Sequence, residues 1–408
     1  MGFSKILTNL NINQTIEFIE KLSIDRPTTE EVLIENALGR IIVNDIYSNI
    51  FIPQFNCSAV DGYAIKLDDL AKSNFELKLI GKNPIGKIFK KNIEPLSTLK
   101  VFTGSHIPDF FDTVVMHEIC KENDKTISFP INIIPGQNIR RRGEDISKSD
   151  RILEEGHILR SQDIGQLAAI GLKRIKIFKP LKIVIFSTGN ELLNPGMKIS
   201  QGKRYDSNKF ILSSFLKQLN CDIVDLGIFK DNLELIKQAI VKNSIDSDII
   251  ITSGSASKGE EDYINKIIHQ IGSIYISKIR VKPGKPLIVG KVNKSLIFAL
   301  PGNTSAMFTI LIRIIKPLVL LLSGASNYLP KCYYVESGFS YKKKSNRVEF
   351  LRVKLSNQNK KTIAIKHSKQ TSGIFQSFIE SDGLVELEEN INYVNKGMLI
   401  KFIPFNEG

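Results

Sequence analysis

Apolar residues in the middle of the chain follow the pattern of buried strands that alternate with helices. Residues 181–186 form an almost continuous apolar run, which is typical of a strand covered on both faces, as in a parallel sheet. Further strands are predicted near residues 222–227 and 248–252, with helices near 207–219 and 232–243. This alternation predicts β-α-β units with right-handed crossovers, and therefore an α/β domain with an open sheet.

Three strand-then-loop units follow one another between residues 248 and 303. The first strand leads into small residues and then acids at 253–262, the second into a lysine- and proline-rich turn at 278–286, and the third into Pro-Gly-Asn at 301–303. Loops at the carboxyl ends of strands in an open α/β sheet are where ligands usually bind. Because these loops would hold acids on one side and lysines on the other, the pattern suits an anion bound beside a divalent cation.

Sequence on both sides of this region has the character of β structure. Residues 65–135 contain short alternating segments separated by Gly, Pro and Asn, which predict a small β domain. From residue 330 onward, strands are expected at 333–340, 348–355, 362–367, 383–387 and 398–402. The chain is therefore predicted to be an α/β plus β protein with several domains.

Helices are also predicted outside the α/β region. Apolar residues recur at helical spacing within 12–22, and another helix is expected at 161–170. A further helix is expected to begin at Thr28, where Glu31 completes a capping-box pattern, and to end at Gly39.

Composition narrows the class of protein. With 408 residues, the chain is longer than one hydrophobic core usually supports, and its 42% hydrophobic and 24% charged residues are ordinary values for a soluble globular protein. The net charge of +14 would suit nucleic acid, but the lysines are spread along the whole chain. A basic surface that favours small anions, or compositional drift towards lysine, explains the excess of basic over acidic residues equally well. No nucleic-acid partner is expected.

The cysteines, the histidines and the longest apolar segment bear on metal sites and on location. The four cysteines stand far apart without a C-x-x-C pair, and the five histidines show no H-E-x-x-H spacing. This usage fits a reducing compartment, so a cytoplasmic protein is expected. The longest apolar segment, 306–322, is interrupted by Arg313, Lys316 and Pro317. Because a membrane span needs about 20 mostly apolar residues, a buried or interface helix is expected there, and no membrane partner.

A set of short motifs carries the most specific information. They are residues 58–64 (Ser-Ala-Val-Asp-Gly-Tyr-Ala), 187–192 (Ser-Thr-Gly-Asn-Glu-Leu), 282–286 (Lys-Pro-Gly-Lys-Pro) and 300–303 (Leu-Pro-Gly-Asn), together with 103–104, 112–118, 138–140, 143–146, 205–208 and 253–263. Each motif alone is weak, but in this order and at these separations they are very specific. On these residues the chain resembles the molybdopterin molybdotransferases, namely the MoeA-type proteins of bacteria and the E domain of gephyrin and its plant counterpart.

The resemblance implies a fold and a domain organisation. The family forms elongated dimers of four-domain subunits that contain a three-layer α/β molybdopterin-binding domain. Composition changes near residues 46, 146, 180 and 327 agree with such domains. The expected set is an α/β molybdopterin-binding domain at 1–26 and 181–326, a linker domain at 27–46 and 147–180, a β insertion domain at 47–146, and a C-terminal β domain at 327–408.

The resemblance also implies an activity. The family transfers molybdenum from molybdate to the dithiolene sulfurs of adenylylated molybdopterin, and the phosphoanhydride bond to AMP is cleaved with Mg²⁺. Lysines and a divalent cation suit this chemistry, because negative charge develops on the leaving phosphate. The expected partners are a second copy of the chain, an adenylyltransferase and acceptor molybdoenzymes.

Site residues are carried over from the same resemblance by position. Glu191 and Asp262 would hold the cation, and Lys278 and Lys282 would face the anions. The remaining catalytic positions fall on Asp61, Thr103, Asp145, Asp231 and Ser372. The loops expected to bind the substrate contribute Ser253, Gly254, Lys285, Pro301 and Gly302. The β insertion would complete the site across the dimer interface.

Simpler explanations exist for several of these residues. Asp262 stands where a helix is expected to begin, and the helix macrodipole favours acids there by about 0.3–1 kcal/mol each. Lys282 and Lys285 flank a Pro-Gly pair, and such lysines are often solvated, although the prolines stiffen the turn and reduce the entropy lost on binding an anion. Two other functions stay open: a non-catalytic scaffold of the same fold and a molybdopterin adenylyltransferase.

Overall fold

The computed structural model describes residues 6–22, 27–254, 263–343, 346–358 and 360–406. The chain divides into two compact units: the first comprises 1–43, 156–160 and 174–408, and the second comprises 44–155 and 161–173. Mixed sheets, helices and a C-terminal barrel confirm the predicted α/β plus β class. The boundaries of the four expected domains stay predictions.

A seven-stranded sheet forms the centre of the first unit. Its order is β1 (Leu7–Leu10), β19 (Ser273–Ile279), β21 (Pro286–Val292), β22 (Ser295–Leu300), β18 (Ile249–Ser253), β14 (Lys182–Thr188) and β17 (Asp222–Phe229). β14 lies parallel to β17 and β18, and β18 lies parallel to β22, whereas β21 is antiparallel to both of its neighbours. The parallel strand predicted at 181–186 is confirmed, and the carboxyl ends of β14, β18 and β22 lie at one edge of the sheet.

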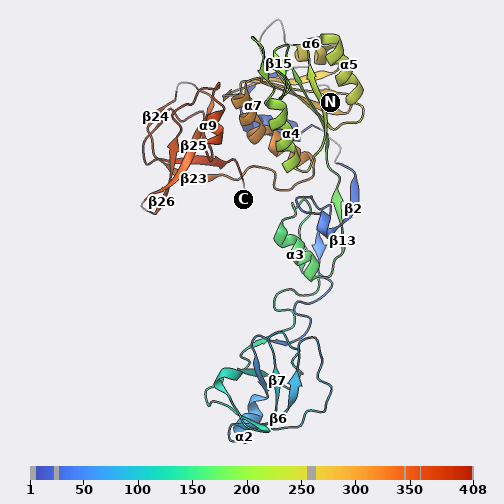
Figure 1. Cartoon of the computed structure of the whole chain (residues 1–408), viewed down its shortest axis with the longest axis vertical. Coiled ribbons are helices and arrows are strands. Elements are labelled where there is room, and N and C mark those ends of the chain that lie inside the picture. Colours follow the sequence, from blue (N-terminus) through green and yellow to red (C-terminus); the bar gives the residue numbers. More distant parts are fainter. Residues whose placement is uncertain (1–5, 23–26, 255–262, 344–345, 359, 407–408) are drawn as a thin grey trace. The chain divides into compact units, whose positions relative to one another are not determined.

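Helices cover both faces of this sheet (Figure 1). On β14, Ile183 and Ile185 belong to a core cluster with α1 (Ile12–Glu20) and α4 (Asn208–Gln218). Val184 and Phe186 belong to another cluster with α5 (Leu233–Asn243) and α6 (Tyr263–Ile271). Because successive side chains of a strand point to opposite faces, these clusters confirm the three-layer arrangement and the helices predicted at 12–22, 207–219 and 232–243.

The long apolar segment predicted to be a buried or interface helix is a core helix. It comprises α7 (Thr304–Ile310), a π-helical turn (Leu311–Ile315) and α8 (Lys316–Leu322). By length and composition alone, Thr304–Leu322 could cross a membrane, but 72% of its most apolar window is buried inside the structure. Leu311, Ile314 and Leu318 belong to the main core of the first unit, which accounts for the apolar composition.

The helix predicted from Thr28 to Gly39 is wrong. Residues Thr29–Leu33 form strand β2, which pairs antiparallel with β13 (Arg174–Phe178), and Ile34–Asn36 forms only a short 3-10 turn. A capping box is a local signal, whereas the pairing of β2 with a strand distant in sequence is a tertiary interaction. Such interactions routinely override local helix signals.

The C-terminal part of the first unit is a β-barrel. Its strands are hydrogen-bonded in the order β25 (Val348–Gln358), β26 (Lys361–Lys366), β23 (Tyr333–Ser337), β29 (Leu399–Pro404) and β27 (Gly383–Leu387), and β27 pairs back with β25. All five strands predicted after residue 330 are confirmed. The short β20 (Val281–Lys282) pairs in parallel with the start of β25, which joins the lysine- and proline-rich turn to the barrel.

The second unit is built on a six-stranded sheet. Its order is β8 (Thr113–Met116), β5 (Gly62–Ile65), β7 (Ser97–Val101), β6 (Glu76–Asn83), β10 (Thr126–Ser128) and β9 (Lys121–Glu122). The small β domain predicted at 65–135 is confirmed, with helix α2 (Leu67–Lys72) added to it. Two short pairs, β4 (Cys57–Ser58) with β11 (Ile139–Arg140) and β3 (Ile46–Tyr47) with β12 (Arg151–Leu153), lie outside this sheet. Helix α3 (Ser161–Ala169) confirms the helix predicted at 161–170.

Candidate functional site

Three strand ends meet at the carboxyl edge of the α/β sheet. Gly254, directly after β18, donates its N–H to the carbonyl of Leu300 at 3.3 Å. A Cβ on Gly254 would lie 2.3 Å from the carbonyl oxygen of Thr188, and a Cβ on Gly302 would lie 3.2 Å from the Cα of Gly254. Because glycine alone allows this close approach, Gly254 and Gly302 let the ends of β14, β18 and β22 converge.

Asp231 fixes the loop that follows β14. The N–H of Asn190 donates to Oδ2 of Asp231 at 3.0 Å, and the N–H of Asp231 donates to Oδ1 of Asn190 at 3.3 Å. These reciprocal bonds give Asp231 a clear positioning role in the loop that carries Glu191. Its predicted catalytic role stays a prediction.

Glu191 is paired with a cation that the sequence analysis missed. Its Oε1 accepts a hydrogen bond from the Arg204 guanidinium at 2.6 Å, and the Glu191 side chain is 38% exposed. Arg204 belongs to β16 (Arg204–Tyr205), which pairs with β15 (Leu192–Leu193) next to Glu191. Asp262, the other predicted metal ligand, lies outside the described residues.

The donor chemistry at this edge of the sheet fits Mg²⁺. Within the part of the chain that the structure describes, no group of three or more Asp, Glu, His or Cys side chains gathers. Mg²⁺ needs only one or two protein carboxylates and otherwise takes water and phosphate oxygens. The half-exposed carboxylate of Glu191 meets that requirement if Arg204 shares it.

One cavity of the first unit gathers five of the predicted residues. Its volume is about 800 Å³, and Lys282, Lys285, Pro301, Gly302 and Ser372 line it. Asn303 of the Pro-Gly-Asn loop also lines the cavity. Sequence analysis missed the remaining polar residues of the lining, which are Tyr341, Arg347, Glu349, Gln370 and Thr371. Two lysines and an arginine therefore share one concave site, which suits an anionic small molecule.

Lys282 is not a solvated lysine of a turn. Its Nζ lies 2.7 Å from Oε1 of Glu349, whose side chain is 4% exposed, while the Lys282 side chain is 40% exposed. The parallel pairing of β20 with β25 places Lys282 directly opposite Glu349. Its ammonium therefore has a fixed place on the cavity wall, whereas Lys285 is exposed.

A buried arginine holds the loop that carries Ser372. Arg352 is 1% exposed, and its guanidinium donates to the carbonyls of Lys369 at 3.2 Å and Thr371 at 3.3 Å. Gln370 accepts from the backbone N–H of Arg352 at 3.0 Å and donates to its carbonyl at 2.8 Å. Burial lowers the pKa of Arg352 to about 10, so its charge is retained at neutral pH. Arg352 therefore positions the loop around Ser372.

Lys278 and Ser253, like Glu191, Asp231 and Gly254, are predicted residues of the first unit that do not line this cavity. Lys278 is half-buried on β19, opposite Pro286 of β21. Ser253 is 1% exposed, and its hydroxyl lies 3.1 Å from the hydroxyl of Ser187. A ligand contact with Lys278 or Ser253 stays a prediction.

In the second unit, the structure brings Asp61 and Thr103 together. Oδ1 of Asp61 accepts hydrogen bonds from the N–H and from the hydroxyl of Thr103, both at 2.8 Å. The backbone bond first, and then the hydroxyl bond, hold the pKa of Asp61 below its usual value of 3.8. Asp145 is exposed, and its N–H donates to the carbonyl of Ile52 at 3.0 Å. The predicted catalytic role of Asp145 stays a prediction.

Replacing Thr103 with valine is expected to raise the pKa of Asp61 towards 3.8, while the remaining backbone bond keeps it lower. The stability that Asp61 contributes is present above the unfolded-state pKa and is lost as the pH falls through the folded-state pKa. Thr103→Val should therefore shift this loss to higher pH. Carboxyl-carbon NMR titration measures the pKa of Asp61 in the parent and in the variant. Asp45, whose pKa is lowered by the Glu155 N–H, is the internal control. An unchanged Asp61 titration would contradict the assignment.

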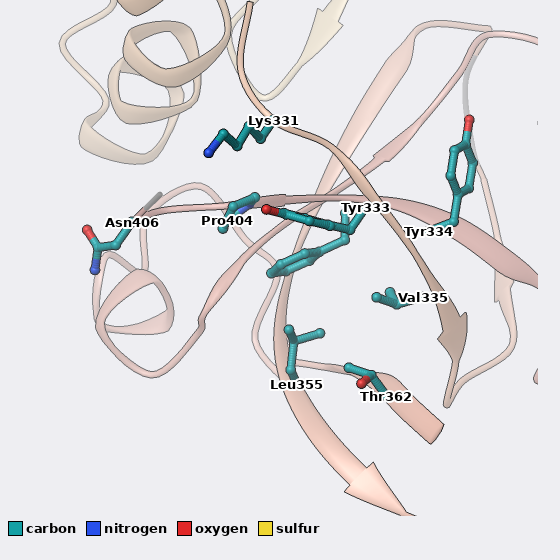
Figure 2. Close-up of a pocket in the computed structure, with 9 residues that line it drawn as sticks. Lys331, Tyr333, Tyr334, Val335, Leu355, Thr362, Pro404 and Asn406 are labelled. Carbon is teal, nitrogen blue, oxygen red and sulfur yellow. The ribbon is translucent and has the colours of Figure 1, made fainter. Parts of the chain in front are cut away.

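A smaller cavity of about 420 Å³ lies on the barrel (Figure 2). It is lined by Lys331, Tyr333, Tyr334, Val335, Leu355, Thr362, Phe402, Pro404 and Asn406. No described member of the predicted site lines this cavity, so the cavity around Lys282 is the candidate functional site. Together, the three-layer sheet, the barrel and the basic cavity define a multidomain α/β protein whose candidate small-molecule site lies by the carboxyl edge of its sheet.

Comparisons with known proteins identify the family within this class. Three family profiles match, described as MoeA N-terminal region (domain I and II) at residues 10–171, "Probable molybdopterin binding domain" at 184–320, and MoeA C-terminal region (domain IV) at 334–405. A molybdopterin molybdenumtransferase of Haemophilus influenzae is 33% identical over 93% of this chain and 95% of its own length. A molybdopterin molybdenumtransferase of Nostoc sp. is 31% identical over 72% of this chain and 70% of its own length.

A solved structure shows the same architecture. The molybdopterin biosynthesis MoeA protein from Pyrococcus horikosii matches with a TM-score of 0.80 and 28% identity, covering 99% of this chain and 100% of that one. The chain therefore belongs to the molybdopterin molybdenumtransferase family of MoeA proteins, and the resemblance read from its motifs is confirmed.

Proposed function

We propose that the protein transfers molybdenum from molybdate to adenylylated molybdopterin and releases AMP, as a step of molybdenum cofactor biosynthesis in the cytoplasm. The observation that carries this proposal is the cavity of about 800 Å³, in which Lys282 and Lys285 of one turn meet Ser372 of a loop distant in the sequence. Membership of the molybdenumtransferase family supports the identity of the substrate.

The chain's own residues bind and orient the substrates. Lys282, Lys285 and Arg347 supply positive charge for oxyanions within one concave site. Arg352 orders the loop of Ser372, whose hydroxyl can donate to an oxyanion. Mg²⁺, held by Glu191 and by the predicted ligand Asp262, would neutralise charge on the phosphoanhydride when bound.

The test is molybdate-dependent release of AMP. Purified protein is mixed with adenylylated molybdopterin and Mg²⁺, and AMP is followed by chromatography with and without molybdate. Molybdate should accelerate AMP release, and molybdenum should be recovered with the pterin. A scaffold protein would bind the substrate without turnover, and an adenylyltransferase would instead form adenylylated molybdopterin from ATP and molybdopterin. Either result would refute the proposal.

We also propose that the active form is a homodimer whose sites are shared between subunits, because the Asp61–Thr103 pair belongs to the second unit and the basic cavity to the first. Sedimentation should give about twice the chain mass of 45.9 kDa. Asp61→Ala and Lys282→Met variants, assayed at a low molybdate concentration at which each alone has little activity, are mixed, unfolded and refolded together. They should recover about a quarter of parent activity, because half of random dimers are mixed and each has one intact site. No recovery would argue against shared sites.

A further inference from the structure

A buried carboxylate, that of Glu349, contacts Lys282 in the lining of the candidate site. Glu349 lies on β25 and its side chain is 4% exposed. Its Oε1 accepts hydrogen bonds from Lys282 Nζ and from the hydroxyl of Tyr341, each at 2.7 Å. Its Oε2 is buried and has no hydrogen-bond partner among the described residues. An ionised carboxylate in such a place requires a cation close by.

The neighbouring groups leave Lys282 as the cation that pairs directly with Glu349. Lys343 is another described ammonium that interacts electrostatically with Glu349, but it donates to the backbone carbonyls of Arg347 and Glu389 at 3.1 Å each, and to that of Glu388. Tyr341 is a neutral partner, because burial and the Glu349 carboxylate raise the pKa of its hydroxyl. Glu349 and Lys282 therefore depend on each other for charge compensation.

The pair also sets where the Lys282 ammonium lies. A lysine side chain has a flexible four-carbon stem and three N–H donors on its ammonium. One N–H is directed to Glu349, which removes the freedom of the stem and leaves donors for an anion in the cavity that both residues line. Preorganisation of this kind lowers the entropy lost when a ligand binds.

We propose that Glu349 is a positioning residue for oxyanion binding: it anchors the Lys282 ammonium on the cavity wall, with Tyr341 as the second donor to the same oxygen. The inference rests on the proposed function, because it assigns molybdate as the anion. It adds a residue that acts through Lys282 and does not itself need to touch the substrate.

The direction in which Glu349→Gln changes molybdate affinity distinguishes a positioning role of Glu349 from a role in charge balance alone. Removing a carboxylate next to an anion site would, by charge alone, strengthen anion binding. Loss of positioning would weaken it. Glu349→Gln keeps the size and an acceptor oxygen but loses the charge that holds Lys282, so molybdate binding measured by calorimetry should become about tenfold weaker. Tighter or unchanged binding would overturn the proposal.

Two further variants sharpen this test. Glu349→Asp keeps the charge but shortens the side chain, so positioning predicts weaker binding, whereas charge balance predicts the parent value. In a Lys282→Met background, Glu349→Gln should have no additional effect on binding, because Glu349 acts through Lys282. The matched control is Glu336→Gln, which breaks the Lys361–Glu336 pair (2.6 Å) elsewhere on the barrel and should leave molybdate binding unchanged.

A second measurement does not depend on molybdate. An ion-paired ammonium acylates slowly, because the pair must break before the neutral amine can attack. Brief labelling with acetic anhydride and mass spectrometry should show the Lys282-to-Lys285 labelling ratio increasing severalfold in Glu349→Gln. An unchanged ratio would refute the anchoring of Lys282. If the ratio rises but the parent does not bind molybdate, the anchoring stands and the proposed function fails.

Discussion

Among substitutions of residues that line the cavity, Lys282→Met is expected to reduce molybdate-dependent AMP release the most. The molybdate concentration for half-maximal AMP release should rise by about tenfold or more, because a charge-assisted hydrogen bond to the anion is removed. Stability should also fall, because the Glu349 carboxylate, 4% exposed, loses its cation. The free energy of unfolding should drop by about 1–2 kcal/mol, less than for a fully buried pair because the Lys282 side chain is 40% exposed.

Two variants separate these effects. In Lys282→Met with Glu349→Gln, no unpaired carboxylate remains, so stability should return towards the parent value while the molybdate requirement stays high. Lys285→Met should raise the molybdate requirement without a loss of stability, since Lys285 is exposed. Steady-state kinetics and urea unfolding report the two quantities. Parent-like molybdate dependence in Lys282→Met would remove this lysine from the site.

Replacing Glu386 with glutamine is expected to cause the largest loss of stability. Oε2 of Glu386 lies 3.0 Å from the Arg313 guanidinium, and the two side chains are 6% and 5% exposed. Arg313 belongs to the π-helical turn within the core helix, and Glu386 belongs to β27 of the barrel. Glutamine would leave the arginine charge buried without its counter-ion, which should cost about 3 kcal/mol. Urea unfolding monitored by circular dichroism measures the change.

The control is again Glu336→Gln, because the Lys361–Glu336 pair has the same kind of geometry on an exposed surface, with side chains 62% and 28% exposed. Breaking this exposed pair should lower the free energy of unfolding by less than about 1 kcal/mol. Replacing both Arg313 and Glu386 with methionine should recover most of the lost stability. Lys401, which lies 3.5 Å from Oε1 of Glu386, also loses this partner, but its side chain is 24% exposed, so no fully buried charge is left isolated. Equal unfolding midpoints for Glu386→Gln and Glu336→Gln would show that burial gives this pair no special weight.

Most secondary structure was predictable because its signals are local. The apolar run at 181–186 specified a strand covered on both faces, and Val184 and Ile185 indeed pack into different clusters. The five C-terminal strands were identified by alternation and turn residues for the same reason. The exception is the segment around Glu31, where a capping-box pattern was outweighed by pairing with β13. A helix cap is encoded within a few residues, but a strand partner is not.

Some residues of the candidate site were likewise predictable from the sequence, and others only from the tertiary structure. The family resemblance that rests on the motifs predicted Lys282, Lys285, Gly302 and Ser372 as site residues, and the structure places all four around one cavity. The sequence alone did not reveal Glu349, because an acid in a predicted strand reads as a solvated position. Its burial and its bond to Lys282 arise from the register of β20 against β25. Long-range strand register is set by the packing of the whole unit, so only the tertiary structure could decide which lysine has a buried counter-ion.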